Sequence, residues 1–375
     1  MASRFKRMLG VIAAGSDPFV ASGLSVFTSA MRQTRAGVSD TRIMLLGDST
    51  TASFGAGATD GWAPNGYSSS LSVLLAQSFN NAGICYASAD AFIGNMNQTY
   101  VQKPTSDNRF NFNGSTTWST TSESLGTAHW MSAGTDRMDY SPAATCDTLD
   151  VRTMIRNGTS VPNAGIIAVY MDDTTLLGTI NNKTAGSDTY TTTTFTFAAG
   201  VHKFSFVKQS GVNAYVHSAY PRLSSRKELS ILVGARPSGT ADTIALETFP
   251  WSGLNAMRTF QPHLTIICIG LNDVPALTAQ ATVESALTRS VAAARETGDA
   301  LLVIPNSRNS PANETTIFGY IQNVATAQSV PLIDRRTAIG TYSQAVAANL
   351  MYDTTHPNAA GYALINAQQF ARITT

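Results

Sequence analysis

Charged residues are scarce in this sequence. Asp, Glu, Lys and Arg make up 13% of its 375 residues, which is about half of the share in typical soluble domains. The formal net charge at pH 7 is +1. Proteins that bind nucleic acid or anionic membrane surfaces usually carry a positive excess. The charge balance therefore argues against both nucleic acid and membrane as partners.

Cysteine clusters and long apolar runs are missing too. Cys85, Cys146 and Cys268 are too widely spaced for a zinc-binding pattern or a disulfide framework. No apolar run reaches the length of about 18 residues that a membrane-spanning helix needs. The chain starts with basic and then apolar residues, but the apolar part is short for a signal peptide, so we expect a leader or docking segment over residues 1–40. The sequence calls for neither a metal nor an organic cofactor.

Hydroxyl and amide side chains take the place of the missing charges. Thr, Ser, Asn and Gly fill long polar stretches of the chain, and such a surface suits secreted or particle-borne proteins that act on neutral polymers. We therefore expect an extracellular, cell-surface or virion-associated protein. The sequence leaves open whether it forms an oligomer or is attached to a larger particle.

The segment Ile43 to Thr50 combines an apolar run with a small polar turn. Its four residues Ile-Met-Leu-Leu are typical of a strand buried on both faces of a parallel sheet. Gly47-Asp48-Ser49 follows directly and presents a hydroxyl at the carboxyl end of that strand, where open α/β sheets bind their ligands. Ser49 is therefore a candidate nucleophile.

Strands and helices alternate in two separate parts of the chain. A helix is expected over residues 67–79, after the first strand. From residue 229 the pattern predicts further strands at 229–233, 264–269, 301–304 and 331–334, with helices at 241–258, 279–296, 317–327 and from about 359. Parallel strands joined by helices predict a three-layer α/β/α domain of flavodoxin-like type, made from residues 41–96 and 229–375.

The intervening residues 97–228 show short alternating segments without helices. Residues 166–171 and 176–180 are strand candidates around the turn Asp172-Asp173, and residues 191–206 are expected to form a hairpin through Ala198-Ala199-Gly200. Regularly spaced short strands predict an antiparallel, jelly-roll-like β-sandwich, inserted into the α/β domain.

Near the C-terminus a histidine stands three residues after an aspartate, in Asp353-Thr354-Thr355-His356-Pro357. Pro357 suits the first turn of the helix that follows and favours an extended conformation at His356. Asp353 can turn back to one ring nitrogen of His356, which leaves the other nitrogen as the acceptor that a general base needs. Alone, each residue is more often a cap or a surface residue.

Taken together, the motifs resemble those of the SGNH (GDSL-type) hydrolase family. Its four blocks have counterparts here in Gly47-Asp48-Ser49, a glycine, Gly270-Leu271-Asn272-Asp273 and Asp353-Thr354-Thr355-His356-Pro357. The resemblance covers residues 41–95 and 229–375. For the glycine of the second block we prefer Gly239, because it follows strand 229–233 closely, and Gly94 is the alternative.

The resemblance implies a serine esterase. Ser49 would attack an ester carbonyl, His356 would take its proton, and Asp353 would orient and stabilise the imidazolium. The backbone N–H groups of Ser49 and Gly239 and the side-chain amide of Asn272 would form the oxyanion hole.

The expected insertion is the best indication of a substrate, since family members with an added β module often deacetylate polysaccharides. Trp118, Trp130 and Tyr140 are candidates for sugar-stacking platforms, and they fit the core of the sandwich equally well. We therefore expect a polysaccharide O-acetylesterase. An esterase for small or short-acyl esters is one alternative, and a non-catalytic carbohydrate-binding adhesin on a vestigial hydrolase fold is another.

Overall fold

A six-stranded parallel sheet forms the centre of the computed structural model, which describes residues 23–56, 69–93, 109–113, 116–119, 128–131, 134, 136–157, 164–184, 186–309 and 311–375. Its strand order is β19-β18-β17-β1-β16-β2, and every pair is parallel. The strands are β1 (Thr41–Gly47), β2 (Ala87–Ser88), β16 (Leu229–Ala235), β17 (Leu264–Cys268), β18 (Asp299–Ile304) and β19 (Leu332–Asp334). The predicted parallel sheet is confirmed.

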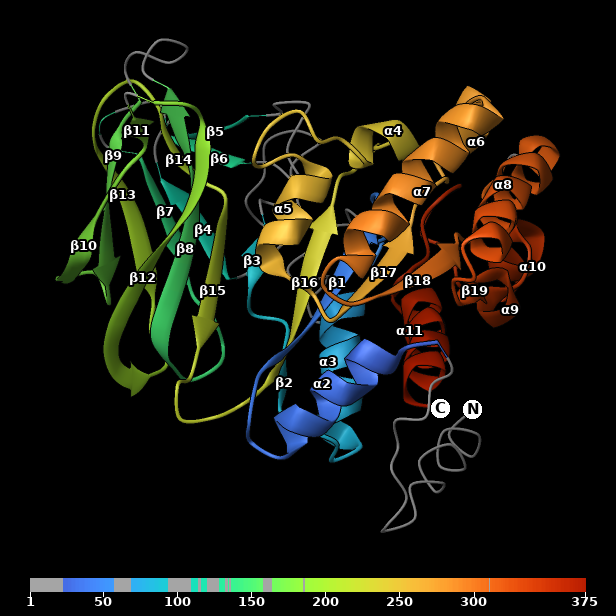
Figure 1. Ribbon diagram of the computed structural model, residues 1–375, viewed down its shortest axis with the longest axis horizontal. Helices are drawn as coiled ribbons and strands as arrows, with labels where there is room; N and C mark the ends of the chain where they lie inside the picture. Colours follow the sequence, from blue (N-terminus) through green and yellow to red (C-terminus); the bar gives the residue numbers. More distant parts are fainter. Residues whose placement is uncertain are drawn as a thin grey trace.

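Helices cover both faces of this sheet (Figure 1). They are α2 (Ser25–Arg35), α3 (Leu71–Asn81), α4 (Ala241–Ile244), α5 (Gly253–Phe260), α6 (Asp273–Ala276), α7 (Gln280–Arg295), the 3-10 turn η1 (Pro311–Asn313), α8 (Glu314–Ala327), α9 (Arg336–Ile339), α10 (Tyr342–Ala347) and α11 (Ala359–Thr374). Within the described residues, no helix is long and apolar enough to cross a membrane.

Alternate residues of β1 divide the apolar core in two. Met44 and Leu46 belong to the core shared with α4, α5, α7 and α8, whereas Ile43 and Leu45 belong to the core shared with α2, α3 and α11. Successive side chains of a strand point to opposite faces, so a strand that is apolar throughout needs cover on both sides. The three-layer α/β/α arrangement is therefore confirmed.

The N-terminal part of the chain differs from the expectation of a separate leader. Helix α2 lies within residues 1–40, yet its Phe27 and Met31 are fully buried in the core of the α/β domain. The carboxylate of Asp299, at the start of β18, accepts a hydrogen bond from the Phe27 backbone N–H at 2.8 Å. Residues 25–35 are thus an integral part of the helical layer.

The helix predicted over residues 241–258 is wrong, because the structure has two helices, α4 and α5, with a loop between them. Pro250 lies in this loop and has no N–H for helical bonding. Gly253 begins α5 so close to α4 that a Cβ atom there would lie 1.9 Å from the carbonyl oxygen of Ile244. The two helices can pack this tightly only with glycine at the contact.

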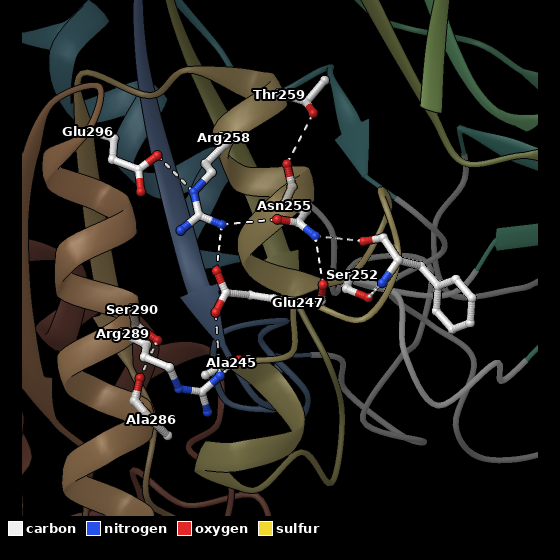
Figure 2. A network of polar contacts seen from close by, with 11 residues as sticks. Ala245, Glu247, Ser252, Asn255, Arg258, Thr259, Ala286, Arg289, Ser290 and Glu296 are labelled. Carbon is white, nitrogen blue, oxygen red and sulfur yellow. Dashed lines mark hydrogen bonds and ion pairs between the residues drawn. The ribbon is translucent and has the colours of Figure 1, made fainter. Parts of the chain in front are cut away.

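Polar contacts fix the loop between α4 and α5 (Figure 2). Arg258 donates to Glu247 at 2.6 Å and to Glu296 at 2.8 Å. The side-chain amide of Asn255 donates to the carbonyl oxygens of Glu247 and Phe249, both at 2.9 Å. These bonds hold the loop to α5 and, through Glu296, to the end of α7.

Strands that are antiparallel, apart from the parallel pair β11 and β8, form a separate β module between β2 and β16, on the left of Figure 1. They are β3 (Phe92–Ile93), β4 (Phe110–Asn113), β5 (Thr116–Ser119), β6 (Ala128–Met131), β7 (Arg137–Tyr140), β8 (Cys146–Asn157), β9 (Ile166–Met171), β10 (Thr175–Asn181), β11 (Lys183–Thr184), β12 (Thr189–Gly200), β13 (Phe204–Ser210), β14 (Ala214–Val216) and β15 (Ser218–Arg222). Three sheets run β10-β9-β13-β7-β4, β11-β8-β15-β3 with β12 on β8, and β14-β6-β5. The jelly-roll type of sandwich stays a prediction.

The expected hairpin over residues 191–206 is wrong. Strand β12 pairs with β8, whereas β13 pairs with β7 and β9 in another sheet. Phe195 of β12 and Phe204 and Phe206 of β13 belong to one apolar core. The alternating pattern correctly predicts which faces of the two strands are buried. The strands, however, do not pair as neighbours: they belong to different sheets, whose side chains meet in this core.

The β module contacts the α/β domain through the loop between α4 and α5. Trp251 is fully buried in a cluster with Met154 and Tyr215 of the module. The guanidinium of Arg156 lies 4.9 Å from the centre of the Trp251 ring, and that of Arg152 lies 4.0 Å from the centre of the Phe260 ring. Apolar burial and cation–π contacts thus join the two parts.

Glu228 is a buried acid at the point where the chain returns from the module to β16. Its side chain pairs with Arg226 at 3.2 Å, and its backbone N–H donates to Asp40. Burial raises the pKa of Glu228 to about 7, although the charge of Arg226 acts in the opposite direction. The folded protein therefore holds a proton here that the unfolded chain releases at lower pH.

Glu228→Gln should change the pH dependence of stability. Because the pKa of Glu228 is raised on folding, its favourable contribution is complete below about pH 4.5 and is lost as the pH rises through about 7. We expect the free energy of unfolding of the variant, relative to wild type, to increase by about 3 kcal/mol between about pH 4.5 and pH 8. Urea unfolding across this range measures it, and Glu296→Gln, at a side chain that is 49% exposed, is the control. Parallel stability curves for Glu228→Gln and wild type would contradict the prediction.

Candidate active site

Ser49 lies in a tight turn directly after β1. The Asp48 carbonyl oxygen accepts hydrogen bonds from the N–H groups of Thr51 and Ala52, and the Ser49 carbonyl oxygen accepts one from Phe54. The carboxylate of Asp48 accepts two more from Thr50, at 2.9 Å from the backbone N–H and 2.8 Å from the hydroxyl. These bonds fix the direction in which the Ser49 side chain leaves the sheet.

Two buried ionisable side chains support the turn from below. Asp48 is fully buried, and this burial raises its pKa, while the Thr50 hydrogen bonds and the positive charge of Arg335 act in the opposite direction. Arg335 is 1% exposed and donates to the Thr50 hydroxyl at 3.2 Å. Thr50 therefore connects the two groups.

His356 lies against both Ser49 and Asp353. Its Nε2 is 2.9 Å from the Ser49 hydroxyl oxygen, and its Nδ1 is 2.9 and 3.1 Å from the two carboxylate oxygens of Asp353. The Asp353 carboxylate also accepts the backbone N–H groups of Thr355 and His356, each at 2.7 Å. The structure thus brings together the three residues that the sequence singles out, although Ser49 and His356 are 307 positions apart in the chain.

The electrostatics of Asp353 suit an ion that orients the imidazole. Partial burial alone would raise its pKa, but the hydrogen bonds from His356 and Thr355 outweigh burial and lower the pKa below its ordinary value. An ionised Asp353 accepts a hydrogen bond from the N–H at Nδ1 of His356. Nε2 is then free to accept the proton of Ser49.

Neighbouring residues hold the loop of His356 in place. Pro357 is buried, and the Asn358 side chain caps α11 by accepting the N–H groups of Ala360 and Gly361. The buried amide of Asn306, directly after β18, donates to the Thr355 carbonyl oxygen at 2.9 Å. The ring of Phe54 meets the His356 ring edge-on, with 4.5 Å between the ring centres.

Asn272 and Gly239 lie next to each other after β17 and β16. The Asn272 amide donates one proton to the Gly239 carbonyl oxygen at 3.1 Å, which leaves its second proton for another acceptor. The Gly239 N–H donates to the Arg236 carbonyl oxygen at 2.9 Å, so its place in an oxyanion hole stays a prediction. Within the described residues, nothing accepts a hydrogen bond from the Ser49 N–H. The alternative glycine, Gly94, lies outside those residues.

Asp273 has a structural part in this loop. It is fully buried, and its carboxylate accepts the backbone N–H of Ala241 at the start of α4 at 3.0 Å. Burial raises the pKa of Asp273. The bond ties the loop after β17 to the segment that carries Gly239.

The aromatic platforms predicted in the β module need a correction. Tyr140 is fully buried, stacks between Phe110 and Phe204, and donates its hydroxyl to the Asp90 carbonyl oxygen. It is a core residue and presents no ring face to a sugar. The backbones of Trp118 and Trp130 lie in the adjacent strands β5 and β6, and their side chains lie outside the described part of the structure.

Sequence reasoning did not single out Arg335, Asn306 or Phe54, all of which support the site. Asn306 had a detectable signal, since it directly follows a strand at the edge where Ser49 lies. Among the residues that the structure describes, no group of three or more His, Cys, Asp or Glu side chains could hold a metal ion.

Residues 196–364 match the model of the GDSL-like lipase/acylhydrolase family, which confirms the resemblance seen in the motifs. A solved peptidoglycan O-acetylesterase structure shares the fold with a TM-score of 0.66 and 13% identity, covering 95% of this chain and 96% of its own. A family two carbohydrate esterase from Cellvibrio japonicus matches with a TM-score of only 0.31 and 13% identity, over 72% of this chain and 96% of its own. No curated protein matches the chain.

Asp353→Asn should leave the position of His356 intact but favour the wrong tautomer. We expect kcat for p-nitrophenyl acetate to fall by about 10⁴-fold. The matched control is Asp172→Asn, which changes a second Asp–His pair, with His202 in the β module, 2.8 Å apart. A loss of activity in the control as well, or none in Asp353→Asn, would contradict the assignment.

Asn272→Ala should remove one donor from the developing oxyanion. We expect kcat to fall by about 10²- to 10³-fold with little change in KM. Asn323→Ala, an exposed asparagine on α8 that bonds to Glu284, serves as the control. Equal thermal unfolding midpoints of the two variants would show that the loss is not a loss of fold, and an unchanged kcat would rule Asn272 out.

Proposed function

We propose that this chain, whose residues 196–364 match the GDSL-like lipase/acylhydrolase family, is a serine esterase that removes O-acetyl groups from a polysaccharide. The hydrogen-bonded series Ser49–His356–Asp353 is the observation that carries the esterase reaction. A nucleophile, a base and a group that orients the base, all within hydrogen-bond distance, form the arrangement that acyl transfer needs.

The reaction follows from these distances. Ser49 attacks the ester carbonyl carbon while its proton passes to Nε2 of His356. Asp353 stabilises the imidazolium that results. The free N–H of the Asn272 amide and the Ser49 backbone N–H donate to the negative oxygen of the tetrahedral intermediate.

His356 then gives the proton to the leaving alcohol, which is a sugar hydroxyl in the proposed substrate. Nε2 next takes a proton from water, which attacks the acyl-enzyme carbonyl, and this proton passes to the Ser49 oxygen as its bond to the acyl carbon breaks and acetate is released. The same series of hydrogen bonds therefore moves the proton in both half-reactions.

Two features support a polysaccharide as the substrate. The β module is joined to the α/β domain by the buried Trp251 cluster. The solved peptidoglycan O-acetylesterase matches over nearly the whole chain, module included. A domain that carries an ester-cleaving site beside a separate β module is suited to a polymer that contacts both.

Hydrolysis of p-nitrophenyl acetate by wild type and by Ser49→Ala tests the esterase reaction. We expect kcat to fall by at least about 10⁴-fold in the variant, since loss of the nucleophile removes covalent catalysis. Acetate release from acetylated xylan, pectin and peptidoglycan then tests the polysaccharide. Wild-type rates equal to those in buffer would favour a protein that only binds carbohydrate, and hydrolysis of small esters alone would favour a small-ester substrate.

A further inference from the structure

We propose that Arg308 recognises a carboxylate of the substrate, so that the acetylated glycan is an acidic one built from sugar acids. The proposal rests on the esterase function proposed above. It concerns a residue that none of the family motifs contains, in the loop directly after β18.

The position of Arg308 is fixed beside the loop of Asn272. Its guanidinium donates to the carbonyl oxygen of Leu271, the residue before Asn272, at 3.4 Å. Its backbone N–H donates to the side chain of Glu314 at 2.5 Å. One end of the residue is thus held by α8 and the other by the loop that carries the proposed oxyanion donor.

The residues that flank Arg308 contact the loop of His356. The N–H of Asn309 donates to the carbonyl oxygen of Thr354 at 2.8 Å, and the amide of Asn306 donates to that of Thr355 at 2.9 Å. Thr354 and Thr355 stand between Asp353 and His356 in the chain. The segment 306–309 therefore makes hydrogen bonds both to the loop of the proposed base and, through Arg308, to the loop of the proposed oxyanion donor.

The charge of Arg308 is available to a ligand. Among the residues that the structure describes, no carboxylate forms an ion pair with its guanidinium, since Glu314 accepts the backbone N–H instead. Its Nε is buried and bonds to none of those residues, while the side chain as a whole is partly exposed. Among the described residues, the carbonyl oxygen of Leu271 is the one polar group that its guanidinium contacts.

A guanidinium favours carboxylates, because its planar N–H groups match the two oxygens of a carboxylate. At this position it would bind a carboxylate on the same sugar as the scissile acetyl group or on the next sugar. A hydrogen bond to a charged group typically contributes enough to change a binding constant by about tenfold or more. Arg308 would thus select acidic over neutral acetyl esters.

The test uses two substrates that differ only in charge: an O-acetylated glucuronide with a free carboxylate, and the same compound as its methyl ester. The measured quantity is the ratio of kcat/KM for the two. We expect wild type to prefer the acid by about tenfold, and Arg308→Met to bring the ratio close to one. Arg308→Lys should keep part of the preference, because it keeps the charge but not the planar group.

Arg295→Met is the matched control. Arg295 is the last residue of α7, and its guanidinium also donates hydrogen bonds to backbone carbonyl oxygens, those of Gln328 and Ser329. Its loss removes a positive charge and similar hydrogen bonds, and it should leave the ratio as in wild type. Raising the salt concentration from about 0.05 to 0.5 M should reduce the wild-type preference, since salt screens the exposed part of the interaction.

Three results would overturn the proposal: equal kcat/KM for acid and methyl ester in wild type, a preference that survives in Arg308→Met, or no hydrolysis of either glucuronide. Turnover of p-nitrophenyl acetate separates these results from failure of the esterase function. If wild type hydrolyses that ester, only the role of Arg308 is refuted. If it does not, the proposed esterase function itself is wrong.

Discussion

The parallel pairing of β1 with β16 on one side and β17 on the other determines where the proposed nucleophile and oxyanion donors of this protein lie. Ser49, Gly239 and Asn272 follow these three strands, so pairing in register places their loops at one edge of the sheet. Parallel strands bring their carboxyl ends together, and such an edge is where α/β proteins bind ligands. In the sheet, β1 lies between β16 and β17, so the chain passes over β1 on its way from β16 to β17. If β1 were displaced, the serine would lose both its base and the amide beside it.

The geometry of this arrangement depends on polar groups buried at the same edge. Asp48, Arg335 and Thr50 form a connected series under the nucleophile turn, and Asp273 ties the loop of Asn272 to α4. Burying charge is costly unless it is paired and hydrogen-bonded, and an apolar substitute would often be more stable. The polar series orients the turn and the loop more strictly than apolar contacts would, because hydrogen bonds fix direction as well as distance. A reaction that needs a hydroxyl 2.9 Å from an imidazole benefits from that fixed direction.

Much of the α/β part could be predicted from the sequence because buried parallel strands are continuous apolar runs. The residues brought together at 49, 353 and 356 were found from motifs whose residue types the chemistry requires. Pairing in the β module could not be predicted, since alternation at Phe195 and Phe204 determines the buried face of a strand but not its neighbour. Arg335 and Asn306 were missed for a related reason: their partners lie 285 and 49 positions away, so each looks like an ordinary polar residue after a strand.

The family match and the structure supply different parts of the same site. The matched region, residues 196–364, contains Asn272, Asp353 and His356 but not Ser49. Ser49 precedes the β module in the sequence. The pairing of β1 with β16 and β17 places it beside the matched residues in space. An insertion of this length is tolerated because the entropic cost of closing a loop grows slowly with its length. The proposed nucleophile can therefore be remote in sequence without being less well placed, provided that β1 stays between β16 and β17, the strands that precede Gly239 and Asn272.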